Sequence, residues 1–185
     1  AVLLRPLPFH EPERLVWIAN TGAGSGLSAV TSRASNLRDW RRLSRSLESL
    51  TGYSAFFDYD SYALIRDGDP ERLNGVPVAQ DFLDVLGVRP QIGRNFVYEE
   101  SIQNGRRAVI LSHGFWTRRF GADPGIVGTS ITLNNASTVV VGVLPASFEF
   151  APVFAPGARV DFLIPFPISE ETDRSGNMLS IIGRL

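Results

Sequence analysis

The chain has 185 residues and a formal net charge of −1, with 18 arginines, 19 acidic residues, no lysine and no cysteine. Its near-balanced charge and its 44% hydrophobic content exclude a disordered tail and a strongly basic nucleic-acid binder. Without cysteine there is no disulfide framework, no thiolate metal site and no cysteine nucleophile. A chain of this length buries roughly 70% of its unfolded surface, so we expect one sizeable core or two small subdomains.

No stretch of the sequence is long enough to cross a membrane. The most apolar run, 139–144, has six residues, whereas a spanning helix needs ~20. The only methionine is Met178, and the apolar start at 1–4 is interpreted as a cut end. We therefore expect a soluble chain that is a mature product or an excised piece.

In chain order, the first predicted elements are an extended proline-containing segment at 5–9, an apolar strand at 15–18 and a Gly/Ser-rich loop at 21–28. An amphipathic helix of about four turns follows, with Ser35 as N-cap and Gly52 as stop signal. Its apolar residues lie three or four positions apart, at Leu37, Trp40, Leu43, Leu47 and Leu50. If this stripe is core, Trp40→Ala costs roughly 3–5 kcal/mol. If the stripe is a docking surface, the cost is under ~1 kcal/mol.

Hairpins and short helices are predicted over the rest of the chain. Aromatic-rich sequence at 53–65 predicts one or two strands, and the turn at 67–70 predicts a hairpin with 72–79. The other predicted elements are a helix at 81–86 ended by Gly87, a strand at 108–111, a helix from N-cap Ser112 to Phe120, a hairpin of 130–133 with 137–144 around Asn134-Asn135, and strands at 160–164 and from 179. Because βαβ alternation is lacking, this order predicts an α+β fold and not a doubly wound parallel sheet.

One glycine pattern has the spacing of a dinucleotide-binding turn. Gly24, Gly26 and Ala29 follow the strand at 15–18 with the spacing Gly-x-Gly-x-x-Ala. That chemistry needs a helix N-terminus directly on the turn, to bind the pyrophosphate. The helix is expected to begin only near Ser35, and no ribose-binding acid follows a second strand, so a flexible connection is favoured.

Ser112 and His113 place a hydroxyl beside an imidazole. Adjacent helical residues point about 100° apart, so the two cannot form a nucleophile–base pair. Ser112 also lacks the Gly-x-Ser-x-Gly elbow, and a capping role explains it. The other histidine, His10, has no metal-ligand spacing to any residue, so a zinc site is not expected.

The acidic and basic side chains are interpreted as solvated surface. A paired-carboxylate hydrolase is an alternative, because such pairs assemble only in three dimensions. The acids considered are Asp58, Asp60, Asp67, Asp69, Asp81, Asp84, Glu99, Glu100, Glu170, Glu171 and Asp173. The arginines at 38, 41, 42, 45, 118 and 119 are interpreted as lying on the solvent-exposed faces of two helices. The alternative is that they dock onto another protein or an anionic lipid surface.

Short segments over nearly the whole chain are similar, in order and spacing, to one family. They include Arg5-Pro6-Leu7-Pro8-Phe9 and Asp81-Phe82-Leu83-Asp84-Val85-Leu86-Gly87. The full set is 2–9 with 12–16, 36–40 with 46–48, 81–90 leading into 93–96, 109–112 with 115–116, 118–124 and 126–128, 140–145 with 148, and 181–185. On these segments the chain resembles the MacB-like periplasmic core domain of ABC transporter permeases, and within that family an acidobacterial-type orphan permease group.

The resemblance implies that residues 1–185 lie between the first and second membrane helices of a permease, at the periplasmic face of the bacterial inner membrane. It implies an α+β fold of mixed sheets, hairpins and short amphipathic helices in two small lobes. Because the family normally continues beyond Leu185, the completeness of the C-terminal lobe stays open.

The implied function is mechanical and non-enzymatic. A cytoplasmic ABC ATPase subunit or domain moves the membrane helices, and the periplasmic domain transmits that motion to a substrate or a periplasmic protein partner. The family supplies no catalytic, cofactor-binding or metal residues, and no nucleic-acid partner is expected. The alternatives are a secreted carbohydrate-active or carbohydrate-binding domain, using the dispersed acids and the aromatics at 53–62, and a free-standing interaction module.

Overall fold

The computed structural model describes residues 9–20, 27–57, 61–66, 69–155 and 157–185. The strands are β1 (Leu15–Ile18), β2 (Ser49–Ser54), β3 (Tyr62–Arg66), β4 (Asp69–Leu73), β5 (Gly75–Val78), β6 (Ile92–Gly93), β7 (Ala108–Leu111), β8 (Ser130–Leu133), β9 (Ala136–Val143), β10 (Phe162–Pro165) and β11 (Leu179–Arg184). The α-helices are α1 (Leu27–Val30), α2 (Ala34–Leu43), α3 (Phe82–Leu86), α4 (His113–Phe120), α5 (Ala151–Phe154) and α6 (Glu170–Arg174), and the 3-10 turns are η1 (Pro12–Arg14), η3 (Tyr98–Glu100) and η4 (Pro124–Ile126).

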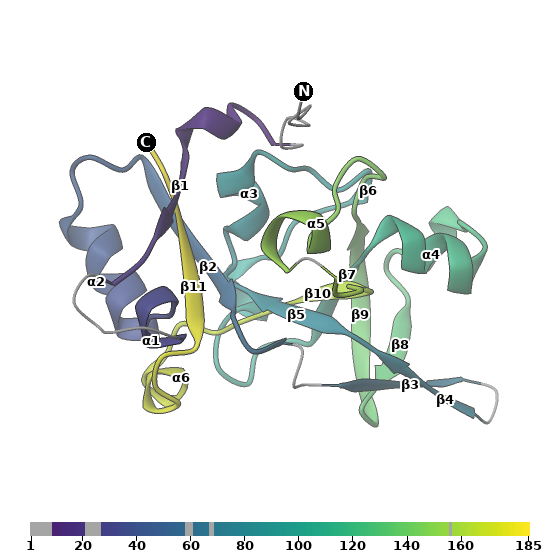
Figure 1. The fold of residues 1–185 in the computed structure, drawn as a ribbon. Coiled ribbons are helices and arrows are strands. Elements are labelled where there is room, and N and C mark those ends of the chain that lie inside the picture. Colours follow the sequence, from purple (N-terminus) through teal and green to yellow (C-terminus); the bar gives the residue numbers. More distant parts are fainter. Residues whose placement is uncertain (1–8, 21–26, 58–60, 67–68, 156) are drawn as a thin grey trace.

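The strands form one mixed sheet in the order β1-β11-β2-β5-β10-β7-β9-β8-β3-β4, with β6 added beside β9 (Figure 1). The pairs β5/β10 and β7/β9 are parallel, and the other neighbouring pairs are antiparallel. Helices and antiparallel hairpins are thus combined without regular βαβ units, which confirms the predicted α+β class.

The central strands are buried on both faces, so their sequences are continuously apolar. In β7, Ala108 and Ile110 belong to a cluster that also contains residues of α3 and the Phe148–Phe154 segment. Val109 and Leu111 belong to a second cluster with α4 and β8. A third cluster joins α2 to β2 and β11. The core is therefore divided among these three clusters.

One residue pair in register, Tyr53 and Val78, joins β2 to β5, and β3 and β8 are likewise joined by one pair, Leu64 and Leu133. By contrast, β11 pairs with β2 through six residue pairs. The β2/β5 junction separates a smaller part, β1, β11 and β2 with α2 and α6, from a larger part that contains the other strands. The strands of both parts belong to one sheet, and the division into two small lobes stays a prediction.

Several element ends that were predicted from capping and turn residues are confirmed. Ser112 precedes α4, and its Oγ accepts a hydrogen bond from the Phe115 N–H at 3.2 Å. Gly87 and Gly121 end α3 and α4 at φ values of 70° and 61°, which favour glycine. Asn134 and Asn135, at φ 49° and 60°, form the predicted β8–β9 turn.

The predicted helix over 35–50 is wrong in its second half. Helix α2 ends at Leu43, and Leu50 belongs to β2. Pairing of β2 with β11 therefore overrides the helical spacing of the leucines, and Gly52 lies inside the strand instead of stopping a helix. Ser35 is also not the N-cap, because α2 begins at Ala34 and the Ser35 N–H donates to the Asp173 carboxylate of α6 at 2.9 Å.

Strand bounds differ from the predictions elsewhere. The hairpin around 67–70 exists, but β4 begins at Asp69 and ends at Leu73, before a separate β5. Strand β10 extends from Phe162 to Pro165, two residues later than predicted at its start. No helix in the described ranges has both the length and the apolar character needed to cross a bilayer.

Candidate functional site

The histidines and Ser112 are held in structural contacts. Gln91 Nε2 and His113 Nδ1 lie 3.0 Å apart, and the Ser112 Oγ is occupied in capping α4. His10 is a surface side chain with its Nε2 3.6 Å from Glu11. Among the residues that the structure describes, no three His, Asp or Glu side chains gather as a metal site would require.

The glycine pattern is followed by a helix earlier than expected. Helix α1 begins at Leu27 and includes Ala29, whereas Gly24 and Gly26 lie outside the described residues. The strand that precedes this turn, β1, is antiparallel to β11, and β11 is antiparallel to β2. Because a dinucleotide-binding unit needs parallel strands joined by the helix, the sheet topology does not fit one.

Several sequence-predicted acids are bound by arginines. Asp81 accepts two hydrogen bonds from Arg41 at 2.7 Å, and Glu100 accepts two from Arg94 at 2.6 Å and 3.0 Å. Asp173 caps α2, and hydrogen bonding to Ser35 lowers the pKa of its carboxyl. Asp58, Asp60 and Asp67 lie outside the described residues.

Asp161 is a buried acid that was not among the predicted candidate residues. It is 1% exposed and accepts hydrogen bonds from the Asn74 N–H at 3.0 Å, Arg118 at 2.9 Å and Arg159 at 3.1 Å. It therefore fixes α4 to the start of β10. Its position directly before the apolar run 162–164 is the one sequence signal that could have found it.

Many of the predicted surface arginines form ion pairs. Arg118 and Arg119 both approach Glu71 of β4, at 3.7 Å and 3.4 Å. Arg42 lies 3.8 Å from Asp39 within α2. These pairs support the interpretation as solvated helix faces and not as a continuous basic surface.

The first candidate functional feature is the terminal junction, which we define as His10, Glu11, Arg14, Glu48 and Arg184. Arg184 is 6% exposed, and its guanidinium donates to three backbone carbonyls instead of a carboxylate. The acceptors are Val85 O at 2.8 Å, His10 O at 2.9 Å and Glu11 O at 3.5 Å. Val85 lies in the last turn of α3, where carbonyls lack intrahelical partners.

Further contacts tie the terminal junction together. Strand β11 lies between β1 and β2, with Arg184 opposite Leu15 on one side and Ser49 on the other. The Leu185 N–H donates to Arg14 O at 2.9 Å, and Arg14 binds the carboxylates of Glu11 and Glu48 at 3.1 Å and 2.9 Å. The N-terminal segment and the end of β11 are thus attached to each other and to α3.

An aromatic cluster continues from the terminal junction into the core. Trp17 of β1 packs on Tyr53 of β2 and on Phe154 of α5, with ring centroids 6.2 Å and 6.1 Å away. Tyr53 also meets Phe150 edge-on at 5.1 Å. Burial raises the pKa of Tyr53 to about 12, and its hydroxyl donates to Phe154 O at 3.4 Å. Displacement of β1 would therefore reach α5 directly.

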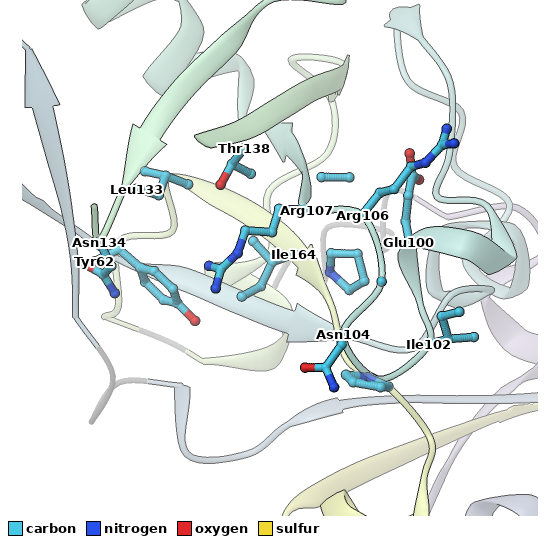
Figure 2. A pocket seen from close by; sticks show the side chains of 14 residues that line it. Tyr62, Glu100, Ile102, Asn104, Arg106, Arg107, Leu133, Asn134, Thr138 and Ile164 are labelled. Atoms are coloured by element: carbon cyan, nitrogen blue, oxygen red, sulfur yellow. The ribbon is translucent and has the colours of Figure 1, made fainter. Parts of the chain in front are cut away.

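The second candidate feature is a hollow of ≈ 320 Å³ at one edge of the sheet, which we call the strand-end groove (Figure 2). Strands β3, β7 and β9 begin at this edge and β8 and β10 end there, because β7 and β9 are parallel to each other whereas the pairs β10/β7, β8/β9 and β3/β8 are antiparallel. Their contributions are Tyr62, Ala108, Thr138, Leu133, Ile164 and Pro165, and the segment 102–107 forms one wall. Since strand order cannot be read from sequence, this groove was not predicted.

Three solved structures share the fold of this chain. The periplasmic region of MacB from Actinobacillus actinomycetemcomitans aligns with a TM-score of 0.63 at 16% identity, covering 92% of this chain and 73% of the other. A domain of a putative permease protein from Porphyromonas gingivalis gives 0.66 at 16% identity, with 96% and 77% coverage. The extracellular domain of the noncanonic ABC-type transporter YknZ from Gram-positive bacteria gives 0.58 at 15% identity, with 92% and 81% coverage.

The family itself is shown by a separate comparison. The family model of the MacB-like periplasmic core domain matches residues 7–184, and the chain belongs to this family. A search of the curated proteins gave no match. The family resemblance stated from the sequence is confirmed, whereas the acidobacterial-type subgroup stays a prediction.

Proposed function

We propose that this chain is a non-enzymatic domain that couples movement of membrane helices to a periplasmic substrate or partner protein. In the proposed parent permease, residues 1–185 lie between the first and second membrane helices, at the periplasmic face of the bacterial inner membrane. A cytoplasmic ABC ATPase subunit or domain supplies the energy. Family membership supports the membrane and ATPase context, and the terminal junction carries the mechanical part of the proposal.

The buried Arg184 is the observation on which the coupling depends. It joins the N-terminal segment, the end of β11 and α3 through backbone carbonyls, which cannot rotate away as side chains can. A displacement applied through β1 and β11 together would therefore also move α3. Helix α3 packs through Phe82, Leu83 and Leu86 into the cluster that contains β7 and β10, so the larger part of the sheet would follow.

The side chains that could act in catalysis already form hydrogen bonds within the fold, which supports a non-enzymatic role. Ser112 caps a helix, and Asp81, Glu100 and Asp161 are bound by arginines. A general base or nucleophile needs an available lone pair within reach of a substrate. Releasing these groups for catalysis would break the contacts that hold α3, α4 and the segment 94–100 in place.

The proposal is tested in the parent permease, reconstituted with its ATPase in vesicles that contain acceptor-labelled lipid. Ser130 is exposed, and Ser130→Cys introduces the only thiol in this domain, to which a donor fluorophore is attached. We expect energy transfer to the lipid to change between the nucleotide-free state and the state with a non-hydrolysable ATP analogue. In an Arg184→Met background the change should be at least halved while the ATPase still binds nucleotide.

Arg159→Met is the matched control, because Arg159 is 58% exposed on its side chain and remote in the chain from the terminal junction. It should leave the nucleotide-dependent change intact. Equal energy transfer in all nucleotide states of the otherwise unmodified permease would overturn the coupling function. An equal loss in both arginine variants would remove the terminal junction as the coupling element.

A further inference from the structure

The strand-end groove contains an arginine whose charge is not neutralised. Arg107 is exposed, and within the described ranges its guanidinium has no ion pair or side-chain hydrogen bond. Figure 2 shows Arg107 extended toward Tyr62 and Asn134, whereas the adjacent Arg106 extends toward Glu100. The charge of Arg106 contributes to lowering the pKa of the Glu100 carboxyl. The side chains of Arg106 and Arg107 therefore lie in different surroundings, although the two residues are adjacent in the chain.

Other groups in the groove add donors and little free negative charge. Asn134 Oδ1 accepts a hydrogen bond from the Ala63 N–H at 2.8 Å, which leaves its Nδ2 group to donate. Among the described residues that line the groove, the one carboxylate is that of Glu100, which is bound by both terminal nitrogens of Arg94, at 2.6 Å and 3.0 Å. Arg107 and Asn134 thus present a cation and an amide donor, and the lining that the structure describes holds no competing free carboxylate.

The wall that carries Arg107 is fixed before any ligand arrives. The Gly105 N–H donates to Ile102 O at 3.0 Å, and the Arg106 N–H donates to Glu99 O at 3.1 Å. A Cβ at Gly105 would lie 2.4 Å from Glu99 O, so this tight path requires glycine. On the other side of Arg107, its carbonyl accepts a hydrogen bond from the Val139 N–H at 3.0 Å. A preformed site of this kind loses little conformational entropy on binding.

An apolar part of the lining lies beside the polar residues Asn104 and Thr138. Leu133, Ile164, Pro165 and Pro167 line the groove, and the Tyr62 ring is held edge-on against Phe162 at 5.2 Å between ring centroids. The volume of ≈ 320 Å³ lies at the lower end of the ~300–1,000 Å³ of small-molecule sites. An exposed guanidinium beside a small, partly apolar hollow fits a monoanion with a compact apolar body.

We propose that the strand-end groove binds a small organic monocarboxylate. The carboxylate accepts paired hydrogen bonds from the planar Arg107 guanidinium, the geometry that this side chain favours. Asn134 Nδ2 donates to the same group from the β8–β9 turn. The apolar body lies on Leu133 and Ile164, with the Tyr62 ring at one side.

The test uses the 185-residue chain and two probes, 3-phenylpropanoate and its neutral amide, 3-phenylpropanamide. Amide-proton NMR shifts are followed during titration at about pH 7, where the carboxylate is ionised. We expect saturable shifts for residues 102–107 and 133–138 with the carboxylate and at least tenfold weaker binding of the amide. Arg107→Met should weaken carboxylate binding about tenfold or more, because it removes a charged hydrogen-bond partner.

Two further variants make the assignment specific. Arg106→Met removes the same charge from the adjacent position and should change the affinity less than about twofold, since its guanidinium faces Glu100. Asn134→Asp keeps an acceptor for the Ala63 N–H but replaces the amide donor by a carboxylate, so it should weaken binding as Arg107→Met does. Equal affinity for the acid and the amide, equal losses in both arginine variants, or no saturable shift at the groove would each overturn the proposal. None of these outcomes bears on the coupling function, which is measured in the parent permease.

Discussion

At the scale of single residues, the molecule uses arginines to neutralise acids that are largely buried. Glu100 is 9% exposed and accepts hydrogen bonds from Arg94 and from the Val97 N–H. Burial raises the pKa of its carboxyl, but these hydrogen bonds and the charges of Arg94 and Arg106 lower it by more, so the pKa lies below its ordinary value. The ionised form is thus favoured in the folded protein.

The first prediction concerns the pH dependence that follows from Glu100. A carboxyl with a depressed pKa in the folded state stabilises the protein above its unfolded pKa, and this contribution is lost as the pH falls through the folded value. The free energy of unfolding of Glu100→Gln should therefore be lower than that of the original chain at about pH 7, and the gap should narrow from about pH 5 to about pH 3. Urea unfolding at several pH values measures the gap. Glu99→Gln, at the exposed neighbouring position, is the control, and a Glu100→Gln gap independent of pH would contradict the prediction.

The roles of single residues could be predicted where their hydrogen-bond partners are close in sequence. Ser112, Gly87, Gly121 and the Asn134-Asn135 turn were identified because capping and positive φ values depend on a few neighbouring positions. Asp161 was not, because two of its partners, Asn74 and Arg118, lie 87 and 43 positions away. The Asp173 cap on α2 was missed for the same reason, at a separation of 138 residues.

At the scale of elements, α2 shows how pairing competes with periodicity. Leucines recur at helical spacing as far as Leu50, but the chain leaves the helix at Ser44, whose ψ is 137°. Leu37 is fully buried in the cluster shared with β2 and β11, whereas Leu43 is 64% exposed. Trp40 is half-buried against the same cluster. Only part of the predicted stripe is therefore core.

The second prediction follows from this difference within one helix. Leu37→Ala should lower the free energy of unfolding by about 2–5 kcal/mol, because it creates a cavity in the cluster of α2, β2 and β11. Leu43→Ala removes the same atoms from an exposed site and should change it by less than about 0.5 kcal/mol. Denaturant unfolding of both variants measures the difference. Equal losses would mean that the helical stripe is buried as a whole, as the sequence pattern indicates.

At the scale of the whole molecule, the composition and order of elements indicated an α+β class but not the sheet. Strands β5 and β10 are parallel neighbours although more than 80 residues separate Val78 from Phe162. Strand β11, the last in the chain, lies between β1 and β2. Such pairings depend on contacts that leave no local signal. The terminal junction and the strand-end groove both result from these long-range pairings, so neither could be identified from sequence.

The third prediction tests whether the terminal junction opens as a unit. Arg184→Met leaves the carbonyls of Val85, His10 and Glu11 without their shared donor, so the segment 10–15 should detach more often. Amide hydrogen exchange should accelerate about tenfold or more at Leu185 and Glu48, whose N–H groups bond within the junction, if about 1.4 kcal/mol of local stability is lost. The Val140 amide, which bonds to Thr129 O, should exchange at an unchanged rate. Acceleration throughout the chain would instead show a global loss of stability.

The direction of β1 relative to β11 has a consequence for how the domain responds to force. Because the strands are antiparallel, Leu15 and Arg184 form the first residue pair at the end where both strands connect to the terminal junction. Forces that draw these two ends apart would load the backbone hydrogen bonds one pair at a time, as in a zipper, so the pairing would yield at low load. Forces that push or pull both ends in the same direction would load no single pair and would carry the sheet along. The pairing of β1 with β11 should therefore separate easily when its two ends are drawn apart and stay intact when they move together. The hydrogen bonds of the Arg184 guanidinium to His10 O and Glu11 O would be the first to break.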